Sequence, residues 1–294
     1  MKFWVGVTDN DWFEFLAQLK PDEVNFWQPG GGKSFKILER DSPFLFKLHS
    51  PRNFIVGGGF FERHSSNLPV SLVWEAFGPK NGAPDYETFL SKILEHRKSR
   101  EPDPLIGCIV LKNPFFFEQS DWIPIPKDWK LNIVTGKYYD TLEPIGGQLW
   151  SRVEMTLRAL AIYGPDYLVH RRLGQGAFRV NVTEAYNRKC AITGERTLPV
   201  LQAAHIKPVS ENGSNEISNG LLLRADLHIL FDEGLITITE KLNIKVSKKI
   251  REKYENGRDY YSLQGGKLRA FPENDRDRPS IELLRWHNQN IFAA

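Results

Sequence analysis

The first 150 residues contain short runs in which apolar and polar positions alternate, separated by turns rich in glycine and proline. Such runs predict β-strands. The expected strands cover 2–7, 24–28, 43–49, 54–63 and 106–117, and 122–130 is expected to be extended. Helical spacing predicts helices over 8–19 and 86–100, while 68–78 suits either a strand or a short helix. Many short strands with few helices favour a small, partly closed β-barrel.

The rest of the chain has more helical patterns. A single apolar stripe predicts a helix over 149–164. A second helix is expected over 178–190, a two-stranded hairpin over 235–251 and a terminal helix over 281–292, in which Trp286 should pack and His287 should face solvent. These patterns predict an α+β protein with a barrel domain over 1–150, a helical and basic linker over 151–177, and a second domain over 178–294.

Composition fits two domains, because 294 residues exceed most single domains and 41% of them are hydrophobic. The charge is uneven. Residues 1–150 carry 17 Lys and Arg against 19 Asp and Glu, a balance of −2, and residues 151–294 carry 22 against 17, a balance of +5. A positive excess in the second half suits binding of a polyanion, although an ordinary soluble surface can carry the same charge.

The two cysteines, Cys108 and Cys190, argue against a disulfide framework and against a four-cysteine zinc site. The N-terminus opens directly into an apolar strand, without the pattern of a signal peptide. No apolar stretch approaches the ~20 residues that a membrane span needs. We therefore expect a soluble, cytoplasmic protein with no membrane partner.

Two residues between 190 and 239 suit phosphodiester hydrolysis. His205 follows the apolar run VLQAA, so a stiff strand would present its side chain. A neutral imidazole with a pKa near ~6.5 is well matched to deprotonating water near pH 7. Asn219 follows the polar loop SENGSNEIS and can tie it through side chain–backbone hydrogen bonds, which would help to orient His205.

His228 and Asp232 are expected on one face of a helix, one turn apart. An imidazole nitrogen and a carboxylate oxygen so placed can bind one divalent ion. Mixed nitrogen and oxygen ligation with water suits Mg²⁺, Mn²⁺ or a similar ion better than a closed structural zinc site.

The segment CAITGERTLPVLQAAHIKP…NGLLLRADLHILFDEGLI resembles the HNH (ββα-metal) endonucleases, in particular the subgroup with AAHI and NGLLL-x-x-D-x-H-x-x-FD. The resemblance implies a catalytic set of His205, Asn219 and His228, in which His205 is the general base and Asn219 organises the loop. It also implies that His228 and Asp232 are the metal ligands.

The chain departs from the common HNH pattern at two places. Many HNH nucleases carry a metal-binding Asp or His directly before the base, where this chain has Ala204. The site then has one protein ligand fewer, or Asp226 contributes. Many also hold a zinc with two CxxC pairs, whereas the first pair is replaced here by Cys190-Ala-Ile-Thr193. We predict no structural zinc and a buried Cys190.

The opening strand–helix–strand, followed by PFLFKLHS and IVGGGFF, resembles the PUA-like superfamily (EVE, YTH and SRA domains), most closely the EVE type over 3–63. Members commonly hold a modified or flipped-out base in an aromatic pocket. The resemblance suggests Phe26, Trp27, His49 and Trp74 as base-binding candidates. Core packing is the alternative for each aromatic residue, and a turn position is the alternative for His49.

Basic residues of the second half are candidate contacts for the DNA backbone. They are Arg171, Arg172, Arg179 and Lys207. The Lys and Arg cluster over 245–253 can be a solvated face or a further backbone contact, which the salt dependence of binding would distinguish.

Together these features suggest a modification-dependent DNA endonuclease of the restriction type. The PUA-like domain would read a modified base, with modified cytosine favoured, and the HNH domain would cut double-stranded DNA with a divalent metal. One such site cuts one strand, so a homodimer is expected. The alternatives are a sequence-directed nicking HNH nuclease and a module that binds modified nucleic acid and has an inactive nuclease domain.

Overall fold

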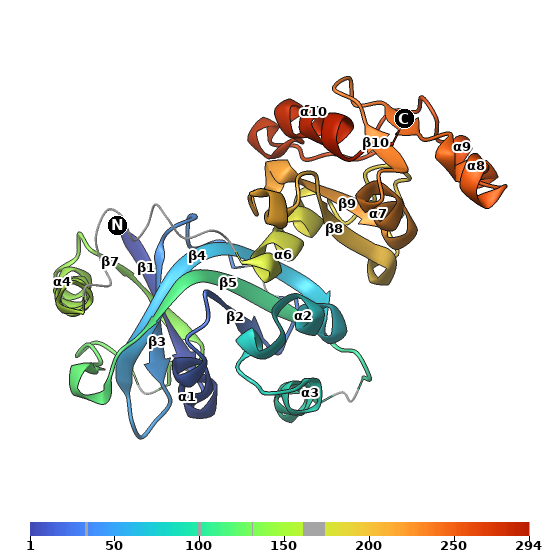
Figure 1. Ribbon diagram of the computed structural model, residues 1–294. Helices are drawn as coiled ribbons and strands as arrows, with labels where there is room; N and C mark the ends of the chain where they lie inside the picture. The colour runs from blue at the N-terminus through green and yellow to red at the C-terminus, as the bar shows by residue number, and fades with distance from the viewer. Residues whose placement is uncertain (33–34, 99–100, 131, 161–173, 294) are drawn as a thin grey trace. The chain divides into compact units, whose positions relative to one another are not determined.

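The computed structural model describes residues 1–32, 35–98, 101–130, 132–160 and 174–293 (Figure 1). The chain divides into two compact units, an N-terminal unit over Met1–Ala177 and a C-terminal unit over Phe178–Ala294. Each unit is described separately below.

The N-terminal unit is built on one mixed sheet. Its strands are β1 (Lys2–Thr8), β2 (Glu23–Gln28), β3 (Pro43–Leu48), β4 (Phe54–Pro69), β5 (Leu105–Phe116), β6 (Ile123–Pro124) and β7 (Gly136–Asp140). The order is β2-β5-β4-β3-β1-β7, and β6 pairs with β4 off this path. β1 and β3 run parallel, and the other pairs are antiparallel.

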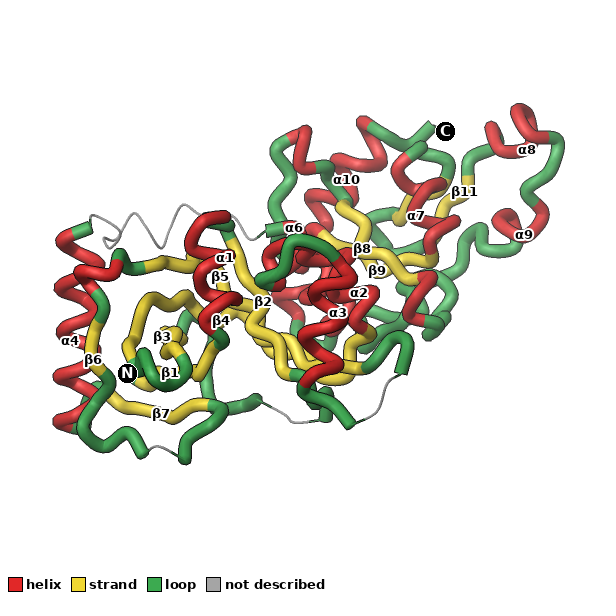
Figure 2. The backbone as a smooth tube through the Cα atoms, turned by 90° about the horizontal axis from the view of Figure 1, so that it is seen from below, coloured by secondary structure: helices red, strands yellow, loops and turns green. Residues whose placement is uncertain are grey.

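The two longest strands, β4 and β5, are visibly curved (Figure 2). Their pairing shifts register at three places, and such bulges bend and twist a strand. Glycine is required at Gly57, where a Cβ would lie 2.3 Å from the carbonyl oxygen of Phe115. Despite this curvature, the pairings of the described residues leave the sheet open between β2 and β7. The expected PUA-like barrel is therefore not confirmed, although the mixed α+β class is.

Helices complete this unit: α1 (Asn10–Leu19), α2 (Val70–Phe77), α3 (Tyr86–Glu95) and α4 (Pro144–Ala159). Two aromatic-rich clusters of the described residues lie in the core of this unit. One includes Trp12 and Leu16 of α1, and the other includes Val153 and Leu157 of α4. The segment 68–78, which suited a strand or a helix, is the end of β4 followed by α2. The helix expected over 149–164 begins earlier, at Pro144, and residues 161–164 lie outside the described residues.

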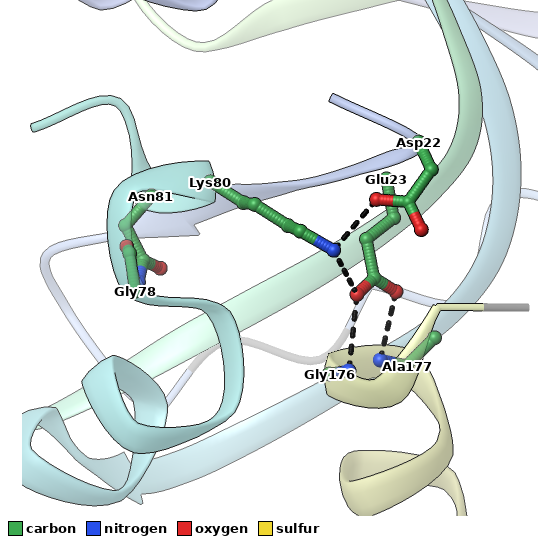
Figure 3. Close-up of polar contacts among 7 residues, drawn as sticks. All are labelled: Asp22, Glu23, Gly78, Lys80, Asn81, Gly176 and Ala177. Atoms are coloured by element: carbon green, nitrogen blue, oxygen red, sulfur yellow. Dashed lines mark hydrogen bonds and ion pairs between the residues drawn. The ribbon is translucent and has the colours of Figure 1, made fainter. Parts of the chain in front are cut away.

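A fully buried carboxylate lies where α6 (Gln175–Ala185) begins (Figure 3). Glu23 accepts hydrogen bonds from the backbone N–H groups of Gly176 at 3.0 Å and Ala177 at 2.9 Å. Lys80 Nζ lies 3.0 Å from Glu23 and 2.6 Å from Asp22. Burial raises the pKa of Glu23, and Lys80 opposes that shift. A carboxylate at this position satisfies N–H groups that have no partner within the helix.

The C-terminal unit contains two small hairpins and several helices. After α6 its elements are β8 (Leu201–His205), β9 (Gly220–Arg224), α7 (Ala225–Asp232), β10 (Ile236–Ile238), β11 (Ile244–Val246), α8 (Lys249–Tyr254), α9 (Arg258–Tyr261) and α10 (Ile281–Asn290). β8 pairs with β9 and β10 with β11, both antiparallel. One apolar cluster joins α6, both hairpins, α7 and α10.

The prediction that His287 faces solvent is wrong. Its side chain is 1% exposed and stacks on Phe231 of α7, with ring centroids 3.8 Å apart. Nδ1 lies 2.8 Å from Thr237 Oγ1, and Nε2 lies 3.1 Å from the carbonyl oxygen of Phe231. Because both ring nitrogens have partners inside the protein, the imidazole can be buried without losing hydrogen bonds.

Candidate active site

The candidate site is built on the β8–β9 hairpin and the helix that follows it. His205 is the last residue of β8 and pairs in register with Gly220, the first residue of β9. α7 begins immediately after β9, so a short segment carries the chain from Asn219 to His228. The hairpin and the helix place the sequence-predicted residues on neighbouring elements.

His205 lies between an aromatic ring and an amide. Its imidazole stacks on Phe178 of α6, with centroids 3.8 Å apart and 11° between the planes. Nε2 lies 2.8 Å from Asn215 Oδ1. An amide oxygen only accepts hydrogen bonds, so Nε2 carries the ring hydrogen and Nδ1 keeps its lone pair. In this tautomer Nδ1 is the atom that can accept a proton.

The pKa of His205 lies below its ordinary value, mainly because burial penalises the charged form. The electrostatic interaction with His228 also lowers the pKa of His205, while the Asn215 hydrogen bond and Asp232 raise it. The lowered pKa favours the neutral form of His205, the form that can accept a proton.

Asn219 is completely buried and ties the loop between β8 and β9. Its Oδ1 accepts from the backbone N–H of Lys207 at 2.8 Å, and its Nδ2 donates to the carbonyl oxygens of Lys207 at 2.9 Å and Ser214 at 2.7 Å. These bonds fix the backbone that follows His205 and bring the end of the loop back to it. Asn219 thus acts on His205 through the loop.

His228 and Asp232 lie one turn apart in α7, with Nε2 3.2 Å from Oδ2. The other ring nitrogen of His228, Nδ1, lies 2.8 Å from Gln202 Oε1 of β8. Two ligands about 2.1 Å from one ion and at right angles to each other stand about 3.0 Å apart. The spacing of Nε2 and Oδ2 therefore fits a shared divalent ion.

Within the described ranges, no third acidic, histidine or cysteine side chain joins this pair. Among the described residues, no three such side chains form a group that could hold a metal ion. Ala204, directly before His205, is buried, and its side chain has no atom that can bind a metal ion. Asp226 is held by Arg224 through two contacts of 2.7 Å, and Tyr260 lies 3.4 Å away. Arg224 also lowers the pKa of Asp226, so this carboxylate is committed to the guanidinium.

Cys190 is fully buried within the apolar cluster of the C-terminal unit. Its sulfur lies 3.5 Å from the backbone nitrogen of Thr193, in a turn that Gly194 completes with a positive φ of 74°. The hydrogen bond from Ala191 N to Leu222 O, 2.7 Å long, attaches this turn to β9. Backbone bonds and apolar packing thus hold the segment where many HNH nucleases have a zinc ligand pair.

The N-terminal unit contains a pocket of about 410 Å³ that includes three of the four base-binding candidates. Phe26, Trp27 and His49 line it, whereas Trp74 is not among the lining residues and packs near Tyr86 and Phe89. The remaining lining residues are Val7, Thr8, Asp9, Trp12, Gln28, Pro29, Gly30, His96, Val134 and Thr135.

The pocket combines aromatic faces with a polar pair. Trp27 is held in place by a hydrogen bond from Nε1 to the carbonyl oxygen of Asn81, 3.0 Å long. His49 Nε2 lies 3.4 Å from Asp9 Oδ1, and both side chains are partly exposed. A planar ligand could stack on the aromatic residues while this pair accepts or donates hydrogen bonds.

The candidate DNA contacts are only partly described. Arg179 is half-buried in α6, and Lys207 Nζ lies 5.0 Å from the ring centroid of Trp286. Arg171 and Arg172 lie outside the described residues. In the 245–253 cluster, Lys248, Lys249, Arg251 and Lys253 are exposed.

Sequence reasoning missed three residues around the two histidines, namely Phe178, Asn215 and Gln202. Phe178 stands in an apolar stripe that predicts only packing, Asn215 lies in a loop with other polar residues, and Gln202 is one polar residue within an apolar strand. Only Gln202 gave a signal, because a polar residue between apolar ones on a short strand invites the search for a partner.

Residues 190–239 match the family model described as HNH endonuclease. The C-terminal unit therefore contains an HNH endonuclease domain, and nucleases of this family typically depend on a divalent metal. No curated protein matches the chain. Among solved structures, the modification dependent TagI restriction endonuclease is similar at 14% identity and a TM-score of 0.29, over 92% of this chain and 76% of that one.

In the part of the chain that the structure describes, no helix is both long enough and apolar enough to cross a membrane.

Proposed function

We propose that the protein is a modification-dependent DNA endonuclease in which the HNH domain cuts and the N-terminal unit reads a modified base, with modified cytosine favoured. The proposed nuclease activity rests on one observation: the β8–β9–α7 segment brings His228 and Asp232 near enough to His205 for both to influence its pKa. The reading function rests on the aromatic pocket of the N-terminal unit, which we assign to a PUA-like domain of the EVE type.

In the proposed reaction His205 is the general base. Nε2 is occupied by Asn215, so Nδ1 accepts the proton of the attacking water. Stacking on Phe178 and the ties of Asn219 hold the ring in one orientation, which keeps the water and the phosphorus aligned. The water then attacks in line, and the 3′ oxygen leaves.

His228 Nε2 and Asp232 Oδ2 would hold the divalent ion, Mg²⁺ or Mn²⁺, together with water. The ion supplies charge stabilisation for the phosphate and the leaving oxygen. Mg²⁺ commonly keeps several waters and takes only one or two protein side chains, so a two-residue ligand set is compatible with it.

The reading step requires a base to leave the duplex stack. Extrusion costs a few kcal/mol, and stacking on aromatic side chains together with hydrogen bonds to the base edge offsets this cost. Phe26 and Trp27 offer the stacking surface, and Asp9 and His49 offer the hydrogen-bonding groups. One HNH site cuts one strand, so we propose that a homodimer makes the double-strand break.

The proposal is tested by digesting DNAs of one sequence that carry 5-methylcytosine, 5-hydroxymethylcytosine, glucosylated cytosine, N6-methyladenine or no modification, with Mg²⁺ or Mn²⁺. We expect cleavage of at least one cytosine-modified DNA and little cleavage of the plain one. Equal cleavage of all five indicates a sequence-directed nuclease. No cleavage of any of them, with His205→Ala unchanged in every assay, indicates a binding module with an inactive nuclease domain.

A matched pair of tryptophan variants separates reading from cutting. Trp27→Ala removes an aromatic face from the pocket, and Trp74→Ala removes a tryptophan of the same unit that does not line it. Loss of one stacked base contact costs about 1–3 kcal/mol, so Trp27→Ala should weaken binding of the modified DNA about 5- to 150-fold. Trp74→Ala should leave binding near the wild-type value. Equal effects of the two variants would place reading elsewhere.

A further inference from the structure

Gln202 is the second residue of β8, half-buried and remote in sequence from the histidine that it contacts. Its Oε1 lies 2.8 Å from Nδ1 of His228, 26 residues later in the chain. Alternate residues of a strand face the same side, so Gln202 shares a face of β8 with Ala204. The side chain of Ala204 cannot bind a metal ion, so on this face of β8 the polar group near His228 is the amide of Gln202.

The contact selects one tautomer of His228. A neutral imidazole has one N–H donor and one lone pair, and the carbonyl oxygen of Gln202 can only accept. Nδ1 therefore carries the hydrogen, and the lone pair lies on Nε2. It is Nε2 that stands 3.2 Å from Asp232 Oδ2. The alternative tautomer would put a hydrogen on Nε2, between the ring and the carboxylate, and would leave no lone pair for an ion there.

We propose that Gln202 is a positioning residue for the metal: it holds His228 as the Nδ1–H tautomer and orients the ring so that Nε2 and Asp232 bind one divalent ion. This inference rests on the proposed nuclease function. A hydrogen-bond partner on the second ring nitrogen fixes a metal-binding histidine, and its loss typically lowers metal affinity 10–100-fold. In this protein the hydrogen-bond partner is the neutral amide of Gln202, on the same strand as His205.

Asn215 makes the matching contact to the other histidine, on the opposite nitrogen. It contacts Nε2 of His205, so the lone pair of that ring lies on Nδ1, whereas Gln202 contacts Nδ1 of His228, so the lone pair of that ring lies on Nε2, beside Asp232. The two amides thus assign different roles to two chemically identical rings. Asn215 is therefore a suitable control, since its loss affects the base and not the metal ligand.

The test measures Mn²⁺ binding to the full-length protein by calorimetry, without DNA. Gln202→Leu keeps the size of the side chain and removes the acceptor, and we expect it to weaken Mn²⁺ binding 10–100-fold. Gln202→Glu keeps an acceptor and should bind Mn²⁺ at least as tightly as the wild type. Asn215→Leu should bind Mn²⁺ within a factor of about three of the wild type. That change is smaller than the 10–100-fold loss expected when a metal-binding histidine loses its hydrogen-bond partner.

Nitrogen NMR of the histidine rings gives a second readout in metal-free protein above pH 7.5. We expect the Nδ1–H form of His228 in the wild type and its loss in Gln202→Leu. Wild-type Mn²⁺ affinity in Gln202→Leu, or an Nε2–H form of His228 in the wild type, would overturn the inference. Failure of the wild type to cut any DNA would instead count against the proposed function, because neither readout uses cleavage.

Discussion

In two regions of the C-terminal unit a histidine ring stacks on a phenylalanine ring, but the two histidines differ in their hydrogen bonds. His205 stacks on Phe178 and His287 stacks on Phe231, each with centroids 3.8 Å apart. His287 is 1% exposed, and both its nitrogens have partners within the protein. His205 is only half-buried, and among the described residues its ring nitrogens have one hydrogen-bond partner, Asn215 at Nε2.

The difference shows what separates a structural histidine from a candidate base. A ring with two internal partners is fixed and cannot exchange a proton with solvent without breaking a bond. A ring with one partner has a defined tautomer and one available lone pair. The aromatic neighbour serves both cases, because it fixes the plane of the ring and leaves the edge nitrogens free to bond. Stacking alone therefore does not reveal function.

The largest expected effect is that of His205→Ala on DNA cleavage. A positioned general base typically contributes about 10²–10⁴ in rate, and we expect a loss of that size in kcat with the substrate that the wild type cuts best. Unfolding should change little in comparison, since the ring is half-buried. A variant that cuts at the wild-type rate would remove His205 from the reaction.

His287→Ala should chiefly lower the stability of the fold, in contrast to His205→Ala. Removing the ring deletes a stacked contact and leaves Thr237 and a backbone carbonyl without their partner, at a cost of about 3 kcal/mol in the free energy of unfolding. Urea unfolding of the two alanine variants side by side measures this. The comparison fails if His205→Ala is the less stable of the two.

The pH dependence of stability should separate the same two residues. Burial lowers the pKa of His287 from 6.5 to about 4, so the unfolded chain takes up a proton near pH 6.5 that the folded protein refuses until about pH 4. The unfolding free energy therefore falls as the pH drops through this window, by about 2 kcal/mol between pH 8 and pH 5. In His287→Phe this part of the loss should disappear, and an unchanged pH profile would show that His287 does not cause it.

The smallest expected effect is a displacement of the activity profile. Because burial lowers the pKa of His205, the neutral base persists below pH 6.5, and cleavage should decline only at a more acidic pH than an exposed histidine would give. The acid limb of kcat/KM measured against pH tests this. If kcat/KM falls to half of its plateau value above pH 6.5, a group other than His205 limits the reaction.

Most strands and helices could be predicted from the sequence, because local periodicity specifies them. Strands β1, β2, β3 and β5 and helices α1, α6, α7 and α10 lie close to the expected segments. The segment 68–78 was ambiguous because short apolar runs suit either structure. Whether the sheet closes into a barrel could not be predicted from the sequence. Closure requires the edge strands β2 and β7 to pair, and the twist and bulges of the strands between them decide whether they do.

For the candidate site, the sequence by itself was enough to propose His205, Asn219, His228 and Asp232, because their spacings and flanks are local features of one fifty-residue segment. Only the tertiary structure decided the contacts that assign roles to their atoms. Gln202 of β8 contacts His228 of α7, and His205 contacts Asn215 of the loop and Phe178 of α6, so these contacts depend on how the elements pack. The tertiary structure also buried His287, because its hydrogen-bond partners Thr237 and Phe231 lie on other elements, 50 and 56 residues earlier in the chain.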